Sequence, residues 1–328
     1  MDAHEQTDEI IEEIKKHLRQ EYARAYRKMR DKALKYLDNF KKQDAELRKK
    51  LKTGKIKKSA YNEWRTRHII TGQLWTNTAH SLAVDLATSD ELVFAYMSGK
   101  MPDIYALNYN YYMWKVETWA AYDTGFALYN RDTIILMMRN GEMPWLPSPS
   151  DATLARIARE GKILWNRKQI TSVMTQGIMQ GLSIPELARQ LELVTERNYK
   201  AAVRNARTMA TGVQNEARYA ASVRAEKMGI NIKNMWRATL DMRTRHEHRL
   251  LDGQVAKVGK PFKVDGYEIK FPGDPSAPAH LVYNCRCTLE ARIDGLTPTA
   301  EKTRSTAKLA GMSYEDWKDM KEGKKIGR

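Results

Sequence analysis

The chain has 328 residues, of which 42 % are hydrophobic, and its mean hydropathy is −0.65. Its 56 basic residues outnumber the 40 acidic ones, and the net charge of +16 favours association with nucleic acid or an anionic membrane surface, unless the lysines only keep helices soluble. No apolar run reaches the length of a membrane-spanning helix, the acidic N-terminus is unlike a signal peptide, and two cysteines exclude a disulfide framework.

Residues 1–150 are predicted to form an extended helical region. Apolar side chains such as Ile14, Leu18 and Tyr22 recur at steps of three and four residues, which predicts one long helix over residues 4–50. A second helical run is expected from residue 59 to residue 87. The segment 92–129 is rich in aromatic residues, which favours packing between helices, with a partner interface as the alternative.

The first long helix is expected to end in a lysine-rich run around Gly54. Lys55, Lys57 and Lys58 in this run are candidate phosphate contacts, and the alternative is that they face only water.

Proline marks the next boundary, because three prolines within residues 144–149 predict an extended hinge or arm. Helices are expected to resume over residues 151–229 and to lead into the following domain. Within them, Ser183 and Glu186 have the spacing of a capping box, and Gly229 is a typical helix stop.

Residues 230–295 are predicted to form a compact α+β domain. Residues 235–240 have the pattern of a strand, residues 244–251 that of a short helix, and Asp265-Gly266 that of a β-hairpin turn. The tail, residues 296–328, is basic and is expected to be partly disordered, with a short helix over residues 314–321. The predicted fold class is mainly α with long N-terminal helices, followed by this small α+β domain.

The two cysteines are candidate metal ligands. On a strand, Cys285 and Cys287 would point to the same face and could hold a structural zinc ion with His248 or His280, and with Asp241 as a candidate oxygen ligand. The alternatives are two thiols packed as small apolar groups and, less favourably, a strained disulfide.

Charged residues precede the cysteines. Asp241, Arg243, Arg245 and Asp252 have the composition of an ion-pair set that locks a strand to the following helix, whereas Arg243 and Arg245 could instead bind phosphate. Further along the chain, Asp274 is expected to accept hydrogen bonds from backbone N–H groups of its loop, and Asn284 to act in the same way before the cysteines.

Four short motifs occur in this region in a fixed order. They are Asp241-x-Arg243-Thr244-Arg245-x-x-His248, Leu251-Asp252-Gly253-Gln254, Pro272-Gly273-Asp274-Pro275 and Asn284-Cys285-Arg286-Cys287-Thr288. In order and spacing the chain resembles the C-terminal domain of the phage Mu F-like head-morphogenesis proteins, which are minor capsid proteins of tailed bacteriophages. The resemblance extends upstream to Asn215 and Arg218, but the chain has Arg207-Thr-Met-Ala210 where the family usually has an Arg-Thr-Glu-Thr-like run.

The resemblance implies a non-enzymatic minor head protein of a tailed phage or prophage. It implies a place in the virion, at the portal vertex or the capsid interior, after assembly in the host cytoplasm. The implied partners are the portal protein, the major capsid or scaffolding protein, and packaged DNA bound without sequence specificity; no membrane partner is expected.

Two other classes of protein stay open at this stage. One is a nucleic-acid-binding module with a structural zinc ion. The other is a nuclease or toxin-like enzyme that uses His248 as a general base, although the sequence has no nucleophile motif, P-loop or carboxylate metal cluster.

Overall fold

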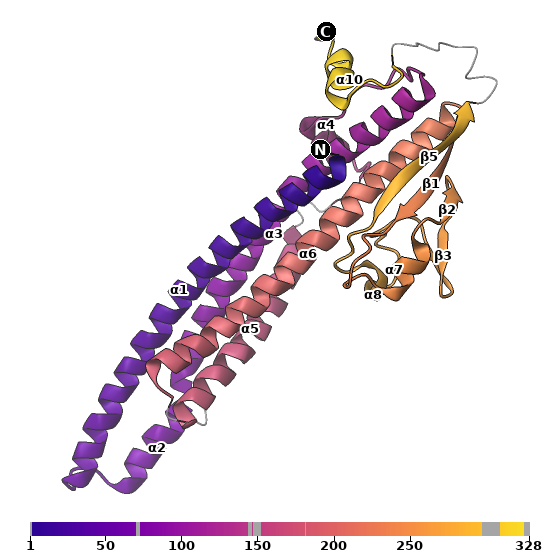
Figure 1. Ribbon diagram of the computed structural model, residues 1–328. Coiled ribbons are helices and arrows are strands. Elements are labelled where there is room, and N and C mark those ends of the chain that lie inside the picture. Colours follow the sequence, from indigo (N-terminus) through magenta and orange to yellow (C-terminus); the bar gives the residue numbers. More distant parts are fainter. Residues whose placement is uncertain are drawn as a thin grey trace. The chain divides into compact units, whose positions relative to one another are not determined.

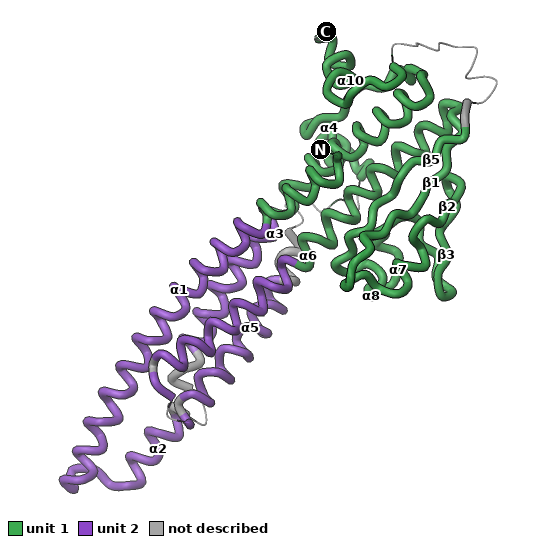
Figure 2. Tube along the Cα trace, viewed as in Figure 1, with its two compact units in different colours: residues 1–14, 97–148, 204–328 green, residues 15–96, 149–203 purple. Residues whose placement is uncertain are grey.

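The computed structural model describes residues 2–69, 73–143, 146, 152–180, 182–296 and 309–324. The chain divides into two compact units, each assembled from segments that are distant in sequence (Figure 2). Unit 1 contains residues 1–14, 97–148 and 204–328, and unit 2 contains residues 15–96 and 149–203. The predicted fold class is confirmed, because long helices precede a small region of short antiparallel strands (Figure 1).

Unit 2 is built from helices. It takes residues from α1 (Ala3–Lys52), α2 (Lys58–Ile69), α3 (Gln73–Ala120), α5 (Ala152–Gln180) and α6 (Ile184–Lys227). Its core follows the predicted periodicity of the first helix, since Leu18, Tyr22 and Met29 are all less than 5 % exposed. The α1 helix ends where Gly54 adopts a φ of +70°, as the sequence predicts.

Two of the expected boundaries can be compared with the structure only in part. Residues 70–72 of the run expected over residues 59–87 lie outside the described residues, as does most of the proline segment 144–150. The capping box is present, because the backbone N–H of Ser183 donates to Oε2 of Glu186 at 2.8 Å.

A buried carboxylate on α3, that of Glu117, holds the helix α10 (Tyr314–Lys321) in unit 1. Trp317 of α10 is fully buried, and its indole N–H donates to Oε2 of Glu117 at 2.7 Å. Lys321 lies 2.9 Å from the same carboxylate oxygen. The helix predicted over residues 314–321 is thus present, and the burial of its tryptophan fixes it to α3; α4 (Arg131–Arg139) belongs to the same unit.

A three-stranded antiparallel sheet, with the order β2-β1-β5, forms the other part of unit 1. It consists of β1 (Ile230–Arg237), β2 (Val255–Lys257) and β5 (Thr288–Leu296). A separate hairpin joins β3 (Phe262–Val264) to β4 (Tyr267–Ile269) through Asp265 and Gly266, both with positive φ, as the Asp-Gly turn predicts. The short helices α7 (His246–Leu251) and α8 (Ala279–Val282) complete the region.

The sheet buries alternate residues of β1. Ile230, Ile232, Asn234 and Trp236 are at most 2 % exposed, so this face of the strand is inside the unit. Helix α6 contacts it, because Nδ2 of Asn234 donates to the hydroxyl of Ser222 at 3.1 Å. Among the described residues, no helix is long and apolar enough to cross a membrane.

Candidate functional site

A row of polar side chains on helix α6 holds the motif Asn284-Cys285-Arg286-Cys287-Thr288. Thr208, Thr211, Asn215 and Arg218 follow one another at steps of three, four and three residues, which places them on one face of the helix. Thr208 accepts the backbone N–H of Asn284 at 2.9 Å, and the Thr211 hydroxyl donates to the carbonyl oxygen of Cys285 at 2.7 Å. The row therefore runs alongside the segment 284–289.

Asn215 is the most completely bonded member of this row. Its Nδ2 donates to the carbonyl oxygens of Cys287 and Pro272, both at 3.0 Å, and its Oδ1 accepts the N–H of Leu289 at 2.7 Å. The side chain is fully buried. One amide thus joins two separate motifs to the helix.

Arg218 occupies the end of the row, and it is also buried. Its guanidinium donates to Oδ1 of Asn108 at 3.0 Å, to the hydroxyl of Thr288 at 2.7 Å and to the carbonyl oxygen of Leu289 at 3.1 Å. Burial lowers the pKa of Arg218 to about 10. All three acceptors are neutral, so the guanidinium charge is not paired with a carboxylate at these contacts.

The cysteines lie in a loop and not on a strand, which corrects the expectation from the sequence. Asn284 adopts a φ of +57° after α8, and the strand β5 begins only at Thr288. The turn at Asn284 and the bonds from α6 nevertheless bring both sulfur atoms to one side. The two thiols are free and only 2 % exposed.

His248 completes a buried cluster with these thiols. Its Nδ1 lies 3.2 Å from Sγ of Cys287 and 3.7 Å from Sγ of Cys285, while its Nε2 lies 2.9 Å from the carbonyl oxygen of Leu281. Because a carbonyl oxygen only accepts, the proton is on Nε2 and the lone pair of Nδ1 faces the sulfur atoms. The three residues are the group of ligand-bearing side chains that could hold a metal ion among the described residues.

The thiols differ in their acidity. A hydrogen bond from Cys285 lowers the pKa of Cys287, whereas the same interaction and burial raise the pKa of Cys285.

Two of the other proposed metal ligands lie elsewhere. His280 is exposed and packs its ring against Tyr267 at a centroid distance of 5.5 Å. The Asp241 carboxylate makes two hydrogen bonds of 2.6 Å with Arg286. Because both of its oxygens are engaged with this guanidinium, Asp241 is not a ligand of the cluster, and the expectation that it is one was wrong.

The expected ion-pair set is rearranged around Asp241. Arg286 is its main partner and holds the pKa of the Asp241 carboxyl well below its usual range. Arg243 is 80 % exposed and lies 3.7 Å from Asp241, so this contact is loose. Arg245 donates to the carbonyl oxygen of Tyr283, and Asp252 accepts the N–H of Ala238 at 2.8 Å, so neither of them pairs with Asp241.

The loop from residue 239 to residue 244 is closed by a threonine. The hydroxyl of Thr244 donates to the carbonyl oxygen of Thr239 and accepts the N–H of Asp241 at 3.0 Å. In the next motif, Leu251-Asp252-Gly253-Gln254, the N–H of Gly253 donates to the carbonyl oxygen of Trp236 at 2.8 Å. Gly253 adopts a φ of +75°, which favours glycine at this turn.

The Pro-Gly-Asp-Pro motif is a turn packed directly on α6. Asp274 is 3 % exposed and accepts the backbone N–H groups of Lys270 at 3.0 Å and Ser276 at 2.9 Å. Gly273 has a φ of +83°, and a Cβ atom there would lie 2.9 Å from the backbone nitrogen of Gly212. A side chain at residue 273 would therefore collide with the helix backbone.

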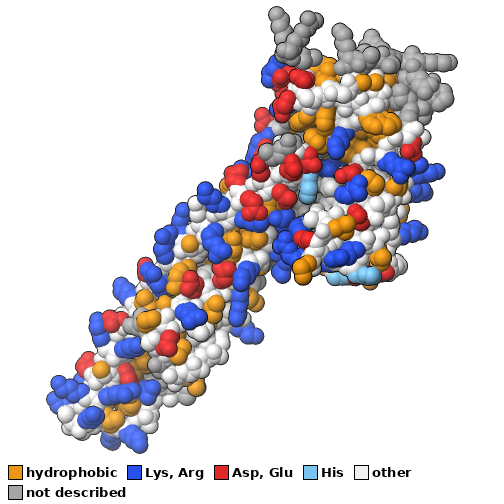
Figure 3. Space-filling model, viewed as in Figure 1, with side chains coloured by type: hydrophobic (Ala, Val, Ile, Leu, Met, Phe, Trp, Pro, Cys, Tyr) orange, Lys and Arg blue, Asp and Glu red, His pale blue; other side chains and the backbone are white. Residues whose placement is uncertain are grey.

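The basic candidates belong to both units. Lys55, Lys57 and Lys58 are exposed at the α1–α2 turn of unit 2, where Figure 3 shows several blue side chains together. Arg243 and Arg245 belong to unit 1.

The α6 row was the part of the site that sequence reasoning left without a role. Asn215 and Arg218 were noticed only through the resemblance, and Thr208, Thr211 and Gly212 were given no function. The available signal was the step of three, four and three residues on a helix whose alanines at 206, 210, 217 and 221 are fully buried.

Comparison with known proteins agrees with the motifs. Residues 168–290 match the family described as Phage Mu protein F like protein. The chain is 28 % identical over 227 residues to minor head protein GP7 of Bacillus phage SPP1, a match that covers 66 % of this chain and 69 % of that protein. No solved structure matches the chain.

A second relative carries the name of an enzyme. The chain is 34 % identical over 151 residues to the NAD(+)--arginine ADP-ribosyltransferase EFV of Enterococcus faecalis (strain ATCC 700802 / V583), a match that covers 46 % of this chain. The chain spans 31 % of the length of that relative. The four motifs and the α6 row all lie within residues 168–290, the segment that is similar to the Phage Mu protein F like family.

Proposed function

We propose that the chain is a structural minor head protein of a tailed bacteriophage or prophage, and that it acts in head assembly. The observation that carries the proposal is the match to minor head protein GP7, which extends over 69 % of that protein and so beyond the family domain. The virion is then its place of action, at the portal vertex or the capsid interior.

The use of the motif residues supports a structural role. Asp241 is paired with Arg286, Asp274 accepts backbone N–H groups, and Asn215 holds two motifs to α6. The polar atoms of these side chains are hydrogen-bonded to other groups of the protein. They therefore stabilise the fold and do not serve to bind a substrate. A rigid surface of fixed shape is what assembly with other head proteins requires.

A nuclease that uses His248 as its base has little support. His248 is 3 % exposed, and its two nitrogens face Cys287 and the carbonyl oxygen of Leu281. A general base needs a free nitrogen within reach of a substrate proton. The transferase activity named for the Enterococcus relative is not proposed for this chain, which spans less than a third of that protein.

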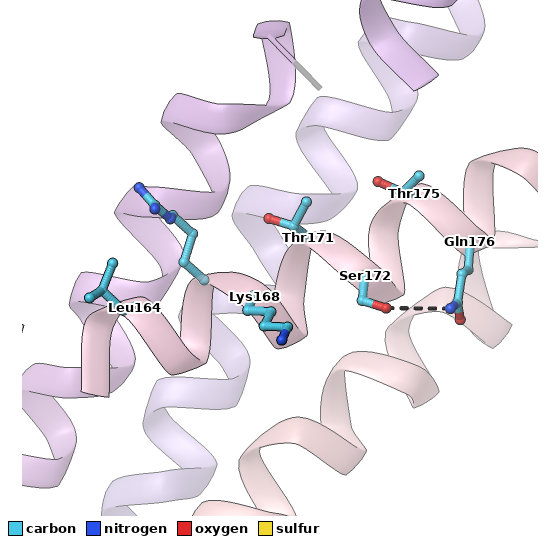
Figure 4. A pocket seen from close by; sticks show the side chains of 7 residues that line it. Leu164, Lys168, Thr171, Ser172, Thr175 and Gln176 are labelled. Carbon is cyan, nitrogen blue, oxygen red and sulfur yellow. Dashed lines mark hydrogen bonds between the residues drawn. The ribbon is translucent and has the colours of Figure 1, made fainter. Parts of the chain in front are cut away.

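The surface hollow that the structure contains in unit 2 also lacks the character of an active site. It has a volume of about 640 Å³ and is lined by residues 164–176 of α5 alone, most of them threonine, serine or basic (Figure 4). None of the motif residues lines it, and it is an open furrow along one helix.

We also propose that the protein contacts packaged DNA without reading its sequence. The support is the net charge of +16 and the exposed lysines of the α1–α2 turn, Lys55, Lys57 and Lys58, with Arg243 as a further exposed candidate. Arg245 is a weaker candidate, because its guanidinium already donates to the carbonyl oxygen of Tyr283. Backbone phosphates bind such groups in any sequence.

The test of the head-protein proposal is co-expression with the portal protein encoded by the same phage genome, followed by size-exclusion chromatography and electron cryomicroscopy. A complex that elutes with the portal ring is the expected result, and its map identifies the docking region. The major capsid and scaffolding proteins are tested in the same way. A chain that elutes alone from all three proteins contradicts the proposal.

A further inference from the structure

The geometry of the buried cluster in unit 1 fits a tetrahedral metal ion. The ligand atoms of His248, Cys285 and Cys287 lie within 4.8 Å of one another, and the two N···S distances are 3.2 and 3.7 Å. A zinc ion at about 2.0 Å from nitrogen and about 2.3 Å from sulfur, with tetrahedral angles, separates N and S by roughly 3.5 Å. The side chains therefore need only small shifts to surround one ion.

The surroundings of the cluster orient its atoms for this purpose. The Nε2–H of His248 is directed to the carbonyl oxygen of Leu281, which leaves the lone pair of Nδ1 directed at the sulfur atoms. The backbone N–H of Cys287 lies 3.4 Å from Sγ of Cys285. Donors of this kind favour thiolates over thiols.

An unpaired donor beside the cluster points the same way. The indole Nε1 of Trp236 is buried and has no hydrogen-bond partner among the described residues. Its ring meets that of His248 edge-on at a centroid distance of 5.9 Å. A buried N–H without a partner is costly, and a thiolate in the neighbouring cluster is a chemically suitable acceptor.

Burial decides which ion is suitable. The three side chains are at most 3 % exposed and lie in the apolar core formed with Trp236, Leu251, Phe262, Leu281 and Leu289. Two isolated thiolates would be expensive in this core, whereas a divalent ion with two thiolates and a neutral imidazole has no net charge. Sulfur and imidazole ligands in this arrangement favour zinc.

We propose that His248, Cys285 and Cys287 bind one structural zinc ion. Among the described residues the group supplies three ligand atoms, and a tetrahedral zinc ion takes one further ligand. The ion ties α7 to the loop that follows α8, in addition to the bond between His248 and the carbonyl oxygen of Leu281. The proposal concerns this cluster only and is independent of the head-protein function.

The first experiment measures zinc in the full-length protein, purified without chelator and without a metal-binding tag, by plasma mass spectrometry. The proposal predicts about one zinc per chain, and cobalt exchange should give the absorption of tetrahedral cobalt bound to thiolate. A folded chain with less than about a tenth of an equivalent overturns it and leaves a cluster held by S–H···N hydrogen bonds.

The second experiment assigns the ligands. Cys287→Ser and His248→Gln are each expected to lower the bound zinc at least about tenfold. His280→Gln changes an exposed histidine outside the cluster and is expected to retain the bound zinc. Full zinc content in the Cys287→Ser protein overturns the proposal.

Because a ligand variant can also fail to fold, a third measurement uses the unmodified protein. Removal of zinc by a strong chelator should lower the unfolding temperature and make both thiols react with a thiol reagent, and added zinc should reverse the two changes. An unfolding temperature that is the same before and after chelation overturns the structural role.

Discussion

Gly212 of α6 and Gly273 of the Pro-Gly-Asp-Pro turn are in direct backbone contact. A Cβ atom at residue 273 would lie 2.9 Å from the nitrogen of Gly212, and one at residue 212 would lie 3.1 Å from the carbonyl oxygen of Gly273. The contact brings the turn close enough for the carbonyl oxygen of Pro272 to reach Asn215. Two glycines therefore set how closely the family motif approaches its supporting helix.

Gly273→Ala is expected to lower the free energy of unfolding by more than the cost of the left-handed backbone conformation alone. The left-handed conformation costs an alanine about 1–2 kcal/mol, and the clash with α6 adds roughly 1–3 kcal/mol. Gly253→Ala is the control, because Gly253 has a φ of +75° but nothing within 4 Å of its added Cβ. Urea unfolding of both variants measures the difference, and equal losses would show that the close contact is unimportant.

Asn215→Ala is expected to cost about 2–4 kcal/mol in the free energy of unfolding, because it leaves the N–H of Leu289 and the carbonyl oxygen of Cys287 buried without this partner. Asn205→Ala changes an exposed asparagine on the same helix and should cost less than about 0.5 kcal/mol. Thermal and urea unfolding give both values. Similar losses for the two variants would mean that Asn215 does not hold the motifs.

Arg286→Ala should destabilise the region around the loop 239–244, whereas Arg243→Ala should leave stability nearly unchanged. Arg286 makes both short bonds to Asp241, while Arg243 is exposed and 3.7 Å away. Hydrogen exchange of the loop amides, compared between the two variants, is the suitable measurement. Greater loss of protection in Arg243→Ala would contradict the assignment of the ion pair.

Glu216 makes stability depend on pH. Burial, and then the nearby charge of Asp274, raise its pKa from 4.5 to about 7, against the opposing effect of Lys270. Between these values the folded state retains a proton that the unfolded state has lost, so stability falls as the pH rises from 4.5 to about 7.

Glu216→Gln should therefore gain up to about 3 kcal/mol above neutral pH and little at acidic pH. Glu226→Gln, at an exposed position of α6, is the control and should show no such pH-dependent gain. Urea unfolding below and above the pH range from 4.5 to about 7 measures the gain in the free energy of unfolding. A gain that is the same at all pH values would rule out titration of Glu216 as its source.

Replacing Lys55, Lys57 and Lys58 together by glutamine should weaken DNA binding equally for different sequences. If each lysine neutralises one phosphate, the slope of log affinity against log salt should decrease in magnitude by about 3. The charge-matched control replaces Lys16, Lys28 and Lys35, three exposed lysines elsewhere on α1. Fluorescence anisotropy over a salt series measures the DNA affinity of both triple variants. Equal losses of affinity would assign the effect to net charge alone.

Local patterns predicted local structure well. The periodic apolar residues predicted α1, the Asp265-Gly266 pair predicted the hairpin turn, and the pattern of residues 314–321 predicted α10; the structure contains all three. In each case the information lies within a few turns of chain, where side-chain spacing and turn chemistry decide the outcome.

The arrangement around the cysteines could not be predicted in the same way. Asn215 meets Leu289 across 74 positions and His248 meets Cys287 across 39, and no local period records such contacts. Cys-x-Cys indicated convergence, but a strand was expected where a left-handed Asn284 and a loop bring the sulfurs together. Arg286 was identified through the motif, while its pairing with Asp241 depends on the folded loop.

The most direct test of the head-protein role is to purify heads made by the phage genome that encodes this chain and to quantify the chain in them by mass spectrometry. We predict that it is present in a fixed ratio to the portal protein and stays bound through a high-salt wash. Heads of normal composition that contain none of the chain would contradict the proposed function.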